Sequence, residues 1–171
     1  PAPNLKETTI TLSDLGMRAR GAWAPNAVNL VIEPATITAL VGKSGEGKTT
    51  TVMALLKQLS ADRGQITLTT SSGETMDLAE VSPDSWWEQT SWLPQMPLLL
   101  PGTLAQNIAE SPAHLKELFP NGEPGEQVSR AASLAGFAEV VAKLPEGWNT
   151  FLRAGGEGLS VGQRQRLALV R

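Results

Sequence analysis

One glycine-rich segment carries the clearest chemistry in the sequence. Residues 42–49 read GKSGEGKT and fit the phosphate-loop pattern G-x-x-x-x-G-K-[ST] at every fixed position. Glycines let the backbone curl so that several N–H groups point at one anion, and a following helix adds the partial positive charge of its N-terminus. Lys48 then supplies a charge for the β- and γ-phosphates of a nucleotide, and the Thr49 hydroxyl is a ligand for Mg²⁺. The segment predicts nucleotide binding, against the weaker alternative of an ordinary glycine-rich turn.

The predicted phosphate contacts come from the whole loop and the residue after it: Gly42, Lys43, Ser44, Gly45, Glu46, Gly47, Lys48, Thr49 and Thr50.

A second candidate anion site lies far downstream, after the flexible sequence GGEG at residues 155–158. The segment LSVGQ begins at Leu159, and Ser160 is a good N-cap for a helix. The N-terminus of that helix is a second place for an anion to bind. A helix that starts with a serine cap is common, so the segment gains specificity only from its pairing with the phosphate loop.

The elements that position these residues follow from hydrophobic periodicity. The β-branched, apolar run 36–41 predicts a buried strand just before the phosphate loop, and residues 48–60 predict a helix after it. Further strands are expected over 8–15, 28–32 and 90–93, and a hairpin is expected over 65–70 and 74–78. Further helices are expected over 83–88, 103–109, 127–135 and 137–142, in the stretch around His114, and from Ser160 onward.

Composition narrows the classes of protein. The chain has 171 residues, 41% of them hydrophobic, which suits one domain or a domain with a small subdomain. The chain has a net charge of −3, so it lacks the excess of basic residues that is typical of a nucleic-acid-binding protein. With no cysteine and a single histidine, disulfides, zinc–thiolate sites and thiol catalysis are excluded. No apolar run approaches the ~20 residues that span a bilayer. Because the sequence does not begin with Met, we expect it to come from the middle of a longer gene.

Together, the two motifs resemble the nucleotide-binding domain of ATP-binding cassette (ABC) transporters, whose signature reads LSGGQ. Here Val161 replaces the first glycine of that pair. Between the motifs, SWLPQ resembles the strand that ends in the family's Q-loop glutamine, at Gln95, and MPLLLPGTLAQNI over 96–108 resembles the exporter form of that loop. The resemblance extends from about Thr8 to Arg171. The segments LPEGWNT and LSVGQ are most similar to exporters of thiols, cysteine or glutathione, in cytochrome bd assembly.

The resemblance implies an α/β fold: a P-loop NTPase-type cassette with an N-terminal antiparallel β subdomain, a parallel-sheet core and an α-helical subdomain, truncated at its C-terminus. It divides the chain into a linker from an upstream membrane domain (1–7), the β subdomain and P-loop core (8–95), the Q-loop and helical subdomain (96–159), and an incomplete signature helix (160–171).

The resemblance also implies a mechanism. Two cassettes pack head to tail and hold ATP between the phosphate loop of one and the signature of the other. Lys48 and Gln95 are the expected catalytic residues, and Thr49 and Gln95 the expected Mg²⁺ ligands. The expected signature residues facing the partner's ATP are Leu159, Ser160, Val161, Gly162 and Gln163. The expected partners are a second cassette and a membrane domain on the same gene, and no nucleic acid is expected to bind. The cassette is expected to lie at the cytoplasmic face of a bacterial cell membrane.

Several departures leave alternatives open. The family stacks adenine on an aromatic side chain, but that slot falls near Met17 and Arg18, so Trp23 is the nearest candidate platform.

The family's Asp-Glu catalytic segment and switch histidine follow the signature helix, and the sequence stops inside that helix, so we expect the fragment alone to be inactive. A cassette that binds ATP but hardly hydrolyses it, in a heterodimeric exporter, is therefore the main rival. A DNA-repair ATPase is weaker, because residues 50–159 lack heptads and cysteine, and a P-loop kinase lacks LSVGQ.

Overall fold

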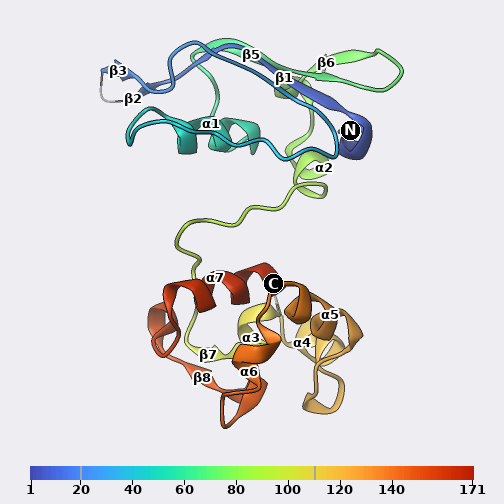
Figure 1. Cartoon of the computed structure of the whole chain (residues 1–171). Coiled ribbons are helices and arrows are strands. Elements are labelled where there is room, and N and C mark those ends of the chain that lie inside the picture. Colours follow the sequence, from blue (N-terminus) through green and yellow to red (C-terminus); the bar gives the residue numbers. More distant parts are fainter. Residues whose placement is uncertain (20, 110) are drawn as a thin grey trace. The chain divides into compact units, whose positions relative to one another are not determined.

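The structure of the chain is a computed structural model that describes every residue except Arg20 and Glu110. The chain divides into two compact units, Pro1–Ser91 and Trp92–Arg171, and each is described by itself (Figure 1). The division lies slightly before the predicted boundary after residue 95, so Gln95 belongs to the second unit. Among the described residues, every helix is too short or too polar to cross a membrane.

A four-stranded antiparallel sheet forms one layer of the first unit. Its spatial order is β4 (Val28–Ile32), β1 (Thr9–Gly16), β5 (Arg63–Thr69) and β6 (Thr75–Asp77). In the central strand β1, Ile10 lies opposite Ile32 on one side and Leu68 on the other. A separate hairpin joins β2 (Arg18–Ala19) to β3 (Ala22–Trp23). The sequence predictions for β1, β4 and the β5–β6 hairpin are confirmed within a few residues.

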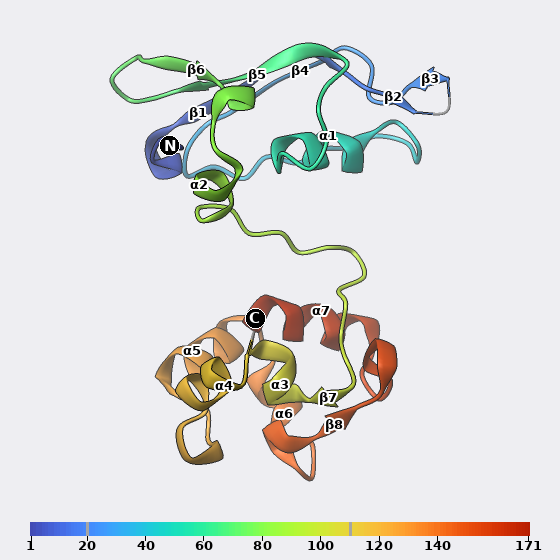
Figure 2. The ribbon, with the colours of Figure 1, turned by 180° about the vertical axis from the view of Figure 1, so that it is seen from behind.

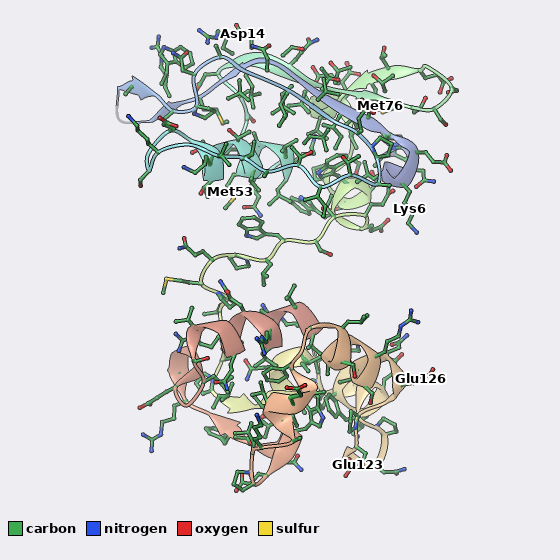
Figure 3. All side chains as sticks on the ribbon, viewed as in Figure 1. Lys6, Asp14, Met53, Met76, Glu123 and Glu126 are labelled. Atoms are coloured by element: carbon green, nitrogen blue, oxygen red, sulfur yellow. The ribbon has the colours of Figure 1, made fainter. Side chains whose placement is uncertain are left out.

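Helix α1 (Lys48–Leu55) packs against this sheet, and α2 (Pro83–Trp87) contributes Trp86 to the same hydrophobic core. Ala54 of α1 is buried in the same core as Leu12 and Leu68, whereas Figure 3 shows Met53 on the side of α1 that faces away from the sheet. Trp86 of α2 is buried, and its indole N–H donates to the Leu55 carbonyl at 2.8 Å. Short 3-10 turns at Leu5–Glu7 and Leu78–Glu80 complete the unit.

The predictions for three segments, residues 36–41, 48–60 and 90–93, differ from the structure. Residues 36–41 form no strand: Ile37 is fully exposed and Val41 is 88% exposed. Residues 90–93 form none either, and every strand pairing among the described residues is antiparallel, so the predicted parallel core is not seen there. A strand needs a neighbour to satisfy its N–H and C=O groups, and neither run has one in the described part of the chain. Helix α1 also ends at Leu55 rather than residue 60, and its buried residues are Thr51 and Ala54.

The second unit is a cluster of short helices around one core (Figure 2). Its elements in chain order are β7 (Gly102–Thr103), α3 (Leu104–Ile108), α4 (Pro112–Leu118), η3 (Pro120–Gly122), α5 (Glu126–Leu134), α6 (Ala138–Val141), η4 (Gly147–Asn149), β8 (Phe151–Leu152), η5 (Ala154–Gly156) and α7 (Val161–Val170). Leu104, Phe137 and Leu167 are fully buried at its centre. The ring of Trp148 packs on this core, with its centroid 5.5 Å from that of Phe119 and 5.9 Å from that of Phe137.

Helix caps explain where the helices of this unit begin. Thr103 and Ser160 each form a capping box, and Ser111 caps α4 by accepting from the His114 N–H at 3.1 Å. Such caps satisfy N–H groups that have no partner within the helix. All the helices predicted in this region are present, within one or two residues of their predicted bounds.

Candidate functional site

The phosphate loop is built on a close backbone contact at Gly47. Gly47 is the N-cap of α1 and adopts the left-handed conformation, with φ 90°. A Cβ atom there would lie 2.2 Å from the Pro25 backbone nitrogen and 2.5 Å from the Ala24 carbonyl carbon. Glycine is therefore required by both conformation and space. The contact holds the loop against the chain segment that directly follows Trp23.

The charged side chains of the loop fold back onto its own backbone. Lys48 Nζ donates to the carbonyl oxygens of Gly42 at 2.8 Å and Lys43 at 2.7 Å. Glu46 Oε2 accepts from the Lys43 N–H at 2.8 Å. Glu46 and Lys43 are both exposed to solvent. In the predicted anion site, the Lys48 ammonium group therefore donates to two loop carbonyls, and the Glu46 carboxylate accepts from one loop N–H group.

The threonines after Lys48 have different surroundings. The Thr51 side chain is buried and donates to the Gly47 carbonyl at 2.9 Å, which ties the first turn of α1 to the loop. Thr49 lies in the same turn with its side chain exposed, and Thr50 is half-buried. A hydroxyl oxygen is a hard ligand that suits Mg²⁺, so the position and chemistry of Thr49 fit that ion.

Trp23 has a crowded position beside the loop. The guanidinium carbons of Arg18 and Arg63 each lie 4.8 Å from the centroid of its ring, and a Cβ on Gly16 would lie 3.2 Å from the ring. Arg63 also bonds Asp14, at 3.0 Å. Of the two residues at the family's usual slot, Met17 is buried and Arg18 is exposed. These contacts fix the indole in place, and its use as an adenine platform stays a prediction.

Gln95 lies in the second unit, where its backbone is tied to α7. Its carbonyl accepts from Gln165 Nε2 at 3.2 Å, and the Leu98 carbonyl accepts from Arg171 at 3.3 Å. The Gln95 side chain is exposed. Since Thr49 and Gln95 belong to different units, the Mg²⁺ site that they would share stays a prediction.

The signature segment forms the start of α7. Ser160 Oγ accepts from the Gln163 N–H at 3.2 Å, and Gln163 Oε1 accepts from the Ser160 N–H at 2.7 Å. Val161 and Gly162 are exposed in the first turn, whereas Leu159 is buried in the core of the unit and anchors the segment. A cavity of about 380 Å³ opens beside this turn. It is lined by Glu139, Val140, Lys143, Leu144, Gly158, Leu159, Ser160, Gly162, Gln163 and Arg166.

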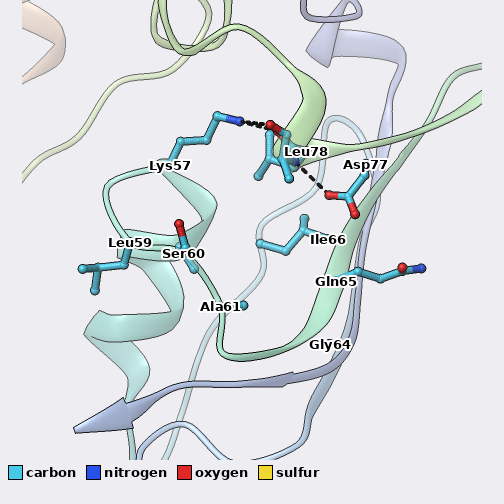
Figure 4. Close-up of a pocket in the computed structure, with 11 residues that line it drawn as sticks. Lys57, Leu59, Ser60, Ala61, Gly64, Gln65, Ile66, Asp77 and Leu78 are labelled. Carbon is cyan, nitrogen blue, oxygen red and sulfur yellow. Dashed lines mark hydrogen bonds between the residues drawn. The ribbon is translucent and has the colours of Figure 1, made fainter.

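Another cavity, of about 250 Å³, lies in the first unit between the end of α1 and strands β5 and β6 (Figure 4). Lys57 reaches along it and donates to the carbonyl oxygens of Leu78 and Ala79, and the Asp77 carboxylate accepts from the Ala79 N–H at 2.8 Å. Its lining residues include none of the predicted site residues. We interpret it as a structural junction, with the lysine completing the backbone bonds of the turn after β6.

The structure therefore gathers the predicted residues into two groups. Residues 42–50 form one loop in the first unit, and Gln95 and the signature segment are joined through Gln165 in the second. Sequence reasoning missed Pro25, the position of the Glu46 carboxylate and Gln165. The spacing of a motif carries no signal for such partners, although a charged residue inside the phosphate loop was visible in the sequence.

The fold and the loop define a class first: a P-loop nucleotide-binding domain, because the glycine-rich loop leads directly into the N-terminus of α1. Residues 25–171 match the ABC transporter family. The chain belongs to the ABC transporter family, and it is similar to the ATP-binding domains of exporter-type members.

Named relatives agree with this assignment. The chain is 35% identical over 144 residues to the "ABC-type transporter atr1" of Mycosarcoma maydis, which covers 84% of the chain and 10% of that protein. It is 35% identical over 146 residues to the "Toxin RTX-I translocation ATP-binding protein" of Actinobacillus pleuropneumoniae, and the match covers 85% of this chain and 19% of that protein. It is 37% identical over 144 residues to the "Mycobactin import ATP-binding/permease protein IrtA" of Mycobacterium tuberculosis, and the match covers 84% of this chain and 15% of that protein. The matched region is therefore less than a fifth of each relative.

A solved structure shows the same fold. The structure of a bacterial Atm1-family ABC exporter with ATP bound superposes with a TM-score of 0.80 and 26% sequence identity. The superposition covers 99% of this chain and 28% of that one. The cassette fold predicted from the two motifs is confirmed at this level.

Proposed function

We propose that the chain binds and hydrolyses ATP as the nucleotide-binding domain of an ABC exporter, and that it drives a small solute across the cytoplasmic membrane. The observation that supports this most directly is the phosphate loop, in which Lys48 and the N-terminus of α1 lie within one short segment. Membership of the ABC transporter family makes ATP the expected nucleotide.

The residues of the loop have distinct roles in this proposal. The loop amides and the N-terminus of α1 hold the phosphates, and the Lys48 ammonium group, which now donates to two loop carbonyls, also donates to β- and γ-phosphate oxygens. Thr49 and Gln95 hold Mg²⁺, which neutralises phosphate charge when bound. Gln95 also orients water and responds to the γ-phosphate. Trp23 is the proposed platform for adenine.

The partners in this proposal are a second cassette and a membrane domain encoded on the same gene. The first turn of α7, at Ser160, Val161, Gly162 and Gln163, faces the ATP held by the second cassette, and Leu159 fixes that turn from below. Residues 1–7 lead from the membrane domain, and the segment from Gln95 to Gly102 lies beside it. The site of action is the cytoplasmic face of a bacterial membrane, and the proposed cargo is a thiol such as cysteine or glutathione.

The test is the replacement Lys48→Ala in the whole protein. Loss of the loop cation removes the only side-chain charge that the proposal places on the β- and γ-phosphates, so ATP affinity should fall by at least about a hundredfold. Binding is measured by displacement of a fluorescent ATP analogue. Unchanged affinity would show that the phosphate-loop assignment is wrong.

The matched control is Lys116→Ala, which removes an exposed lysine from α4 and should leave ATP affinity unaltered. ATP turnover by the unaltered protein is measured in parallel, with and without a thiol cargo in inverted membrane vesicles. ATP binding without turnover would favour the weakly hydrolysing cassette over the ATPase.

A further inference from the structure

We infer that the Glu46 carboxylate is a built-in competitor for the phosphate site, and that it lowers the affinity of this loop for ATP. The inference rests on the proposed function, because it concerns the same loop. It adds a residue that sets nucleotide affinity through its side chain, whereas the motif assigns only the backbone of this position to binding.

The Glu46 side chain is exposed, but its carboxylate is bonded to the backbone of the loop instead of to solvent alone. Its Oε2 accepts from the Lys43 N–H at 2.8 Å, and the Glu46 N–H in turn donates to the Lys43 carbonyl at 3.4 Å. The same Oε2 lies 2.3 Å from the place where a Cβ on Gly42 would be, so only a glycine at 42 leaves room for it. The fixed glycine of the motif thus accommodates an acidic side chain in this chain.

A carboxylate and a phosphate oxygen need the same partners. Both are anions that accept short, charge-assisted hydrogen bonds from backbone N–H groups. In a phosphate loop the amides of this turn are the groups that bind phosphate. While Glu46 holds the Lys43 N–H, that amide is not available to ATP, and its negative charge opposes the approach of a triphosphate.

Lys48 completes a self-satisfied state of the loop. Its ammonium group donates to the Gly42 and Lys43 carbonyls, so Lys43 is bonded at its N–H by Glu46 and at its C=O by Lys48. Nucleotide binding in the proposed manner requires the Glu46 carboxylate to leave the Lys43 N–H, whereas the Lys48 ammonium group has a third N–H for a phosphate oxygen. The cost of moving the carboxylate is subtracted from ATP affinity, and it can be removed without touching the essential lysine.

The experiment compares Glu46→Ser, Glu46→Gln and the unaltered whole protein in equilibrium binding of ATP and of inorganic pyrophosphate. Because Glu46 is exposed and screened by solvent, we expect Glu46→Ser to bind both about fivefold more tightly. Glu46→Gln keeps an acceptor for the Lys43 N–H but loses the charge, so its affinity for ATP and pyrophosphate should lie between that of the unaltered protein and that of Glu46→Ser. Raised salt should narrow the differences, since exposed charges are screened. Adenosine, which has no phosphate, serves as a probe that should not distinguish the variants.

The matched control is Glu74→Gln, which removes an exposed carboxylate from the β5–β6 turn of the same unit and should leave affinity unchanged. Thermal unfolding confirms that each variant is folded. Equal or weaker binding of ATP and pyrophosphate by Glu46→Ser would overturn the inference, as would an equal gain in Glu74→Gln. Absence of ATP binding by the unaltered protein is a different result, and it would refute the proposed function itself.

Discussion

Asn107 is the residue that fixes the chain after Gln95. It is buried, its amide N–H groups donate to the carbonyls of Leu100 and Thr103 at 3.0 Å each, and its oxygen accepts from the Leu100 N–H at 2.9 Å. One side chain therefore satisfies both backbone groups of Leu100, next to the buried Leu99. The side chains of Met96 and Leu98 are exposed, so these hydrogen bonds act together with the packing of Leu99 in the core to order the segment.

The replacement Asn107→Ala should destabilise this segment. It leaves partly buried backbone groups of Leu100 and Thr103 without these partners, and the expected cost is about 1–3 kcal/mol. Hydrogen exchange measured by mass spectrometry should become faster over residues 96–108. Gln127→Ala, at an exposed position on α5, is the control and should change nothing. Unaltered protection over 96–108 would show that these hydrogen bonds do not hold the segment.

At this scale, the sequence predicted the residues of the phosphate loop but not their partners. A fixed spacing such as G-x-x-x-x-G-K-T specifies a backbone shape, and the shape determines where Lys48 and Thr49 lie. It does not specify that the Glu46 carboxylate accepts from the Lys43 N–H, or that Pro25 lies against Gly47, a contact that depends on chain segments brought together by the fold. Gln165 was missed for the same reason.

Among the elements, those confirmed are the ones whose signal is local. Local hydrophobic patterns predicted β1 and β4, and the serine cap at Ser160 predicted the start of α7. The wrong prediction over 36–41 interpreted an apolar β-branched run as a buried strand, and the one over 90–93 interpreted a short run as another strand. Such a run indicates that burial would be favourable, but strand formation also needs a partner, and a local pattern contains no information about the partner.

The cap of α7 offers a prediction that separates stability from chemistry. Ser160→Ala removes the acceptor for the Gln163 N–H and should destabilise the helix by about 1 kcal/mol. Ser160→Asp keeps a good cap, so the stability of α7 should be preserved, but its charge opposes a phosphate at the same turn. Under the proposed function, both replacements lower ATP turnover, whereas only Ser160→Ala speeds hydrogen exchange at the start of α7.

The control for this pair is Ser129→Ala on α5, a serine that donates from within a helix rather than capping its start. It should leave both exchange at α7 and ATP turnover unaltered. Full turnover in Ser160→Asp would contradict the role of this turn in binding phosphate.

At the scale of the whole chain, the two units have separate hydrophobic cores. One is centred on Leu12, Leu68 and Trp86, and the other on Leu104, Phe137 and Leu167. Among the described residues, no side chain belongs to both buried clusters. Cores without shared side chains have no direct route by which a cavity in one weakens packing in the other. The sequence suggested a domain with a subdomain, but only the structure shows that each unit has its own core.

This separation predicts that core mutations act locally. Phe137→Ala should cost about 3–5 kcal/mol and Leu68→Ala about 2–5 kcal/mol, because each leaves a cavity in a fully buried site. In the whole protein, hydrogen exchange should accelerate over residues 92–171 for the first variant and over 1–91 for the second. Without ATP, the effects of the double variant should add to within about 0.5 kcal/mol. Faster exchange in both units from either single change would show that the two units unfold as one.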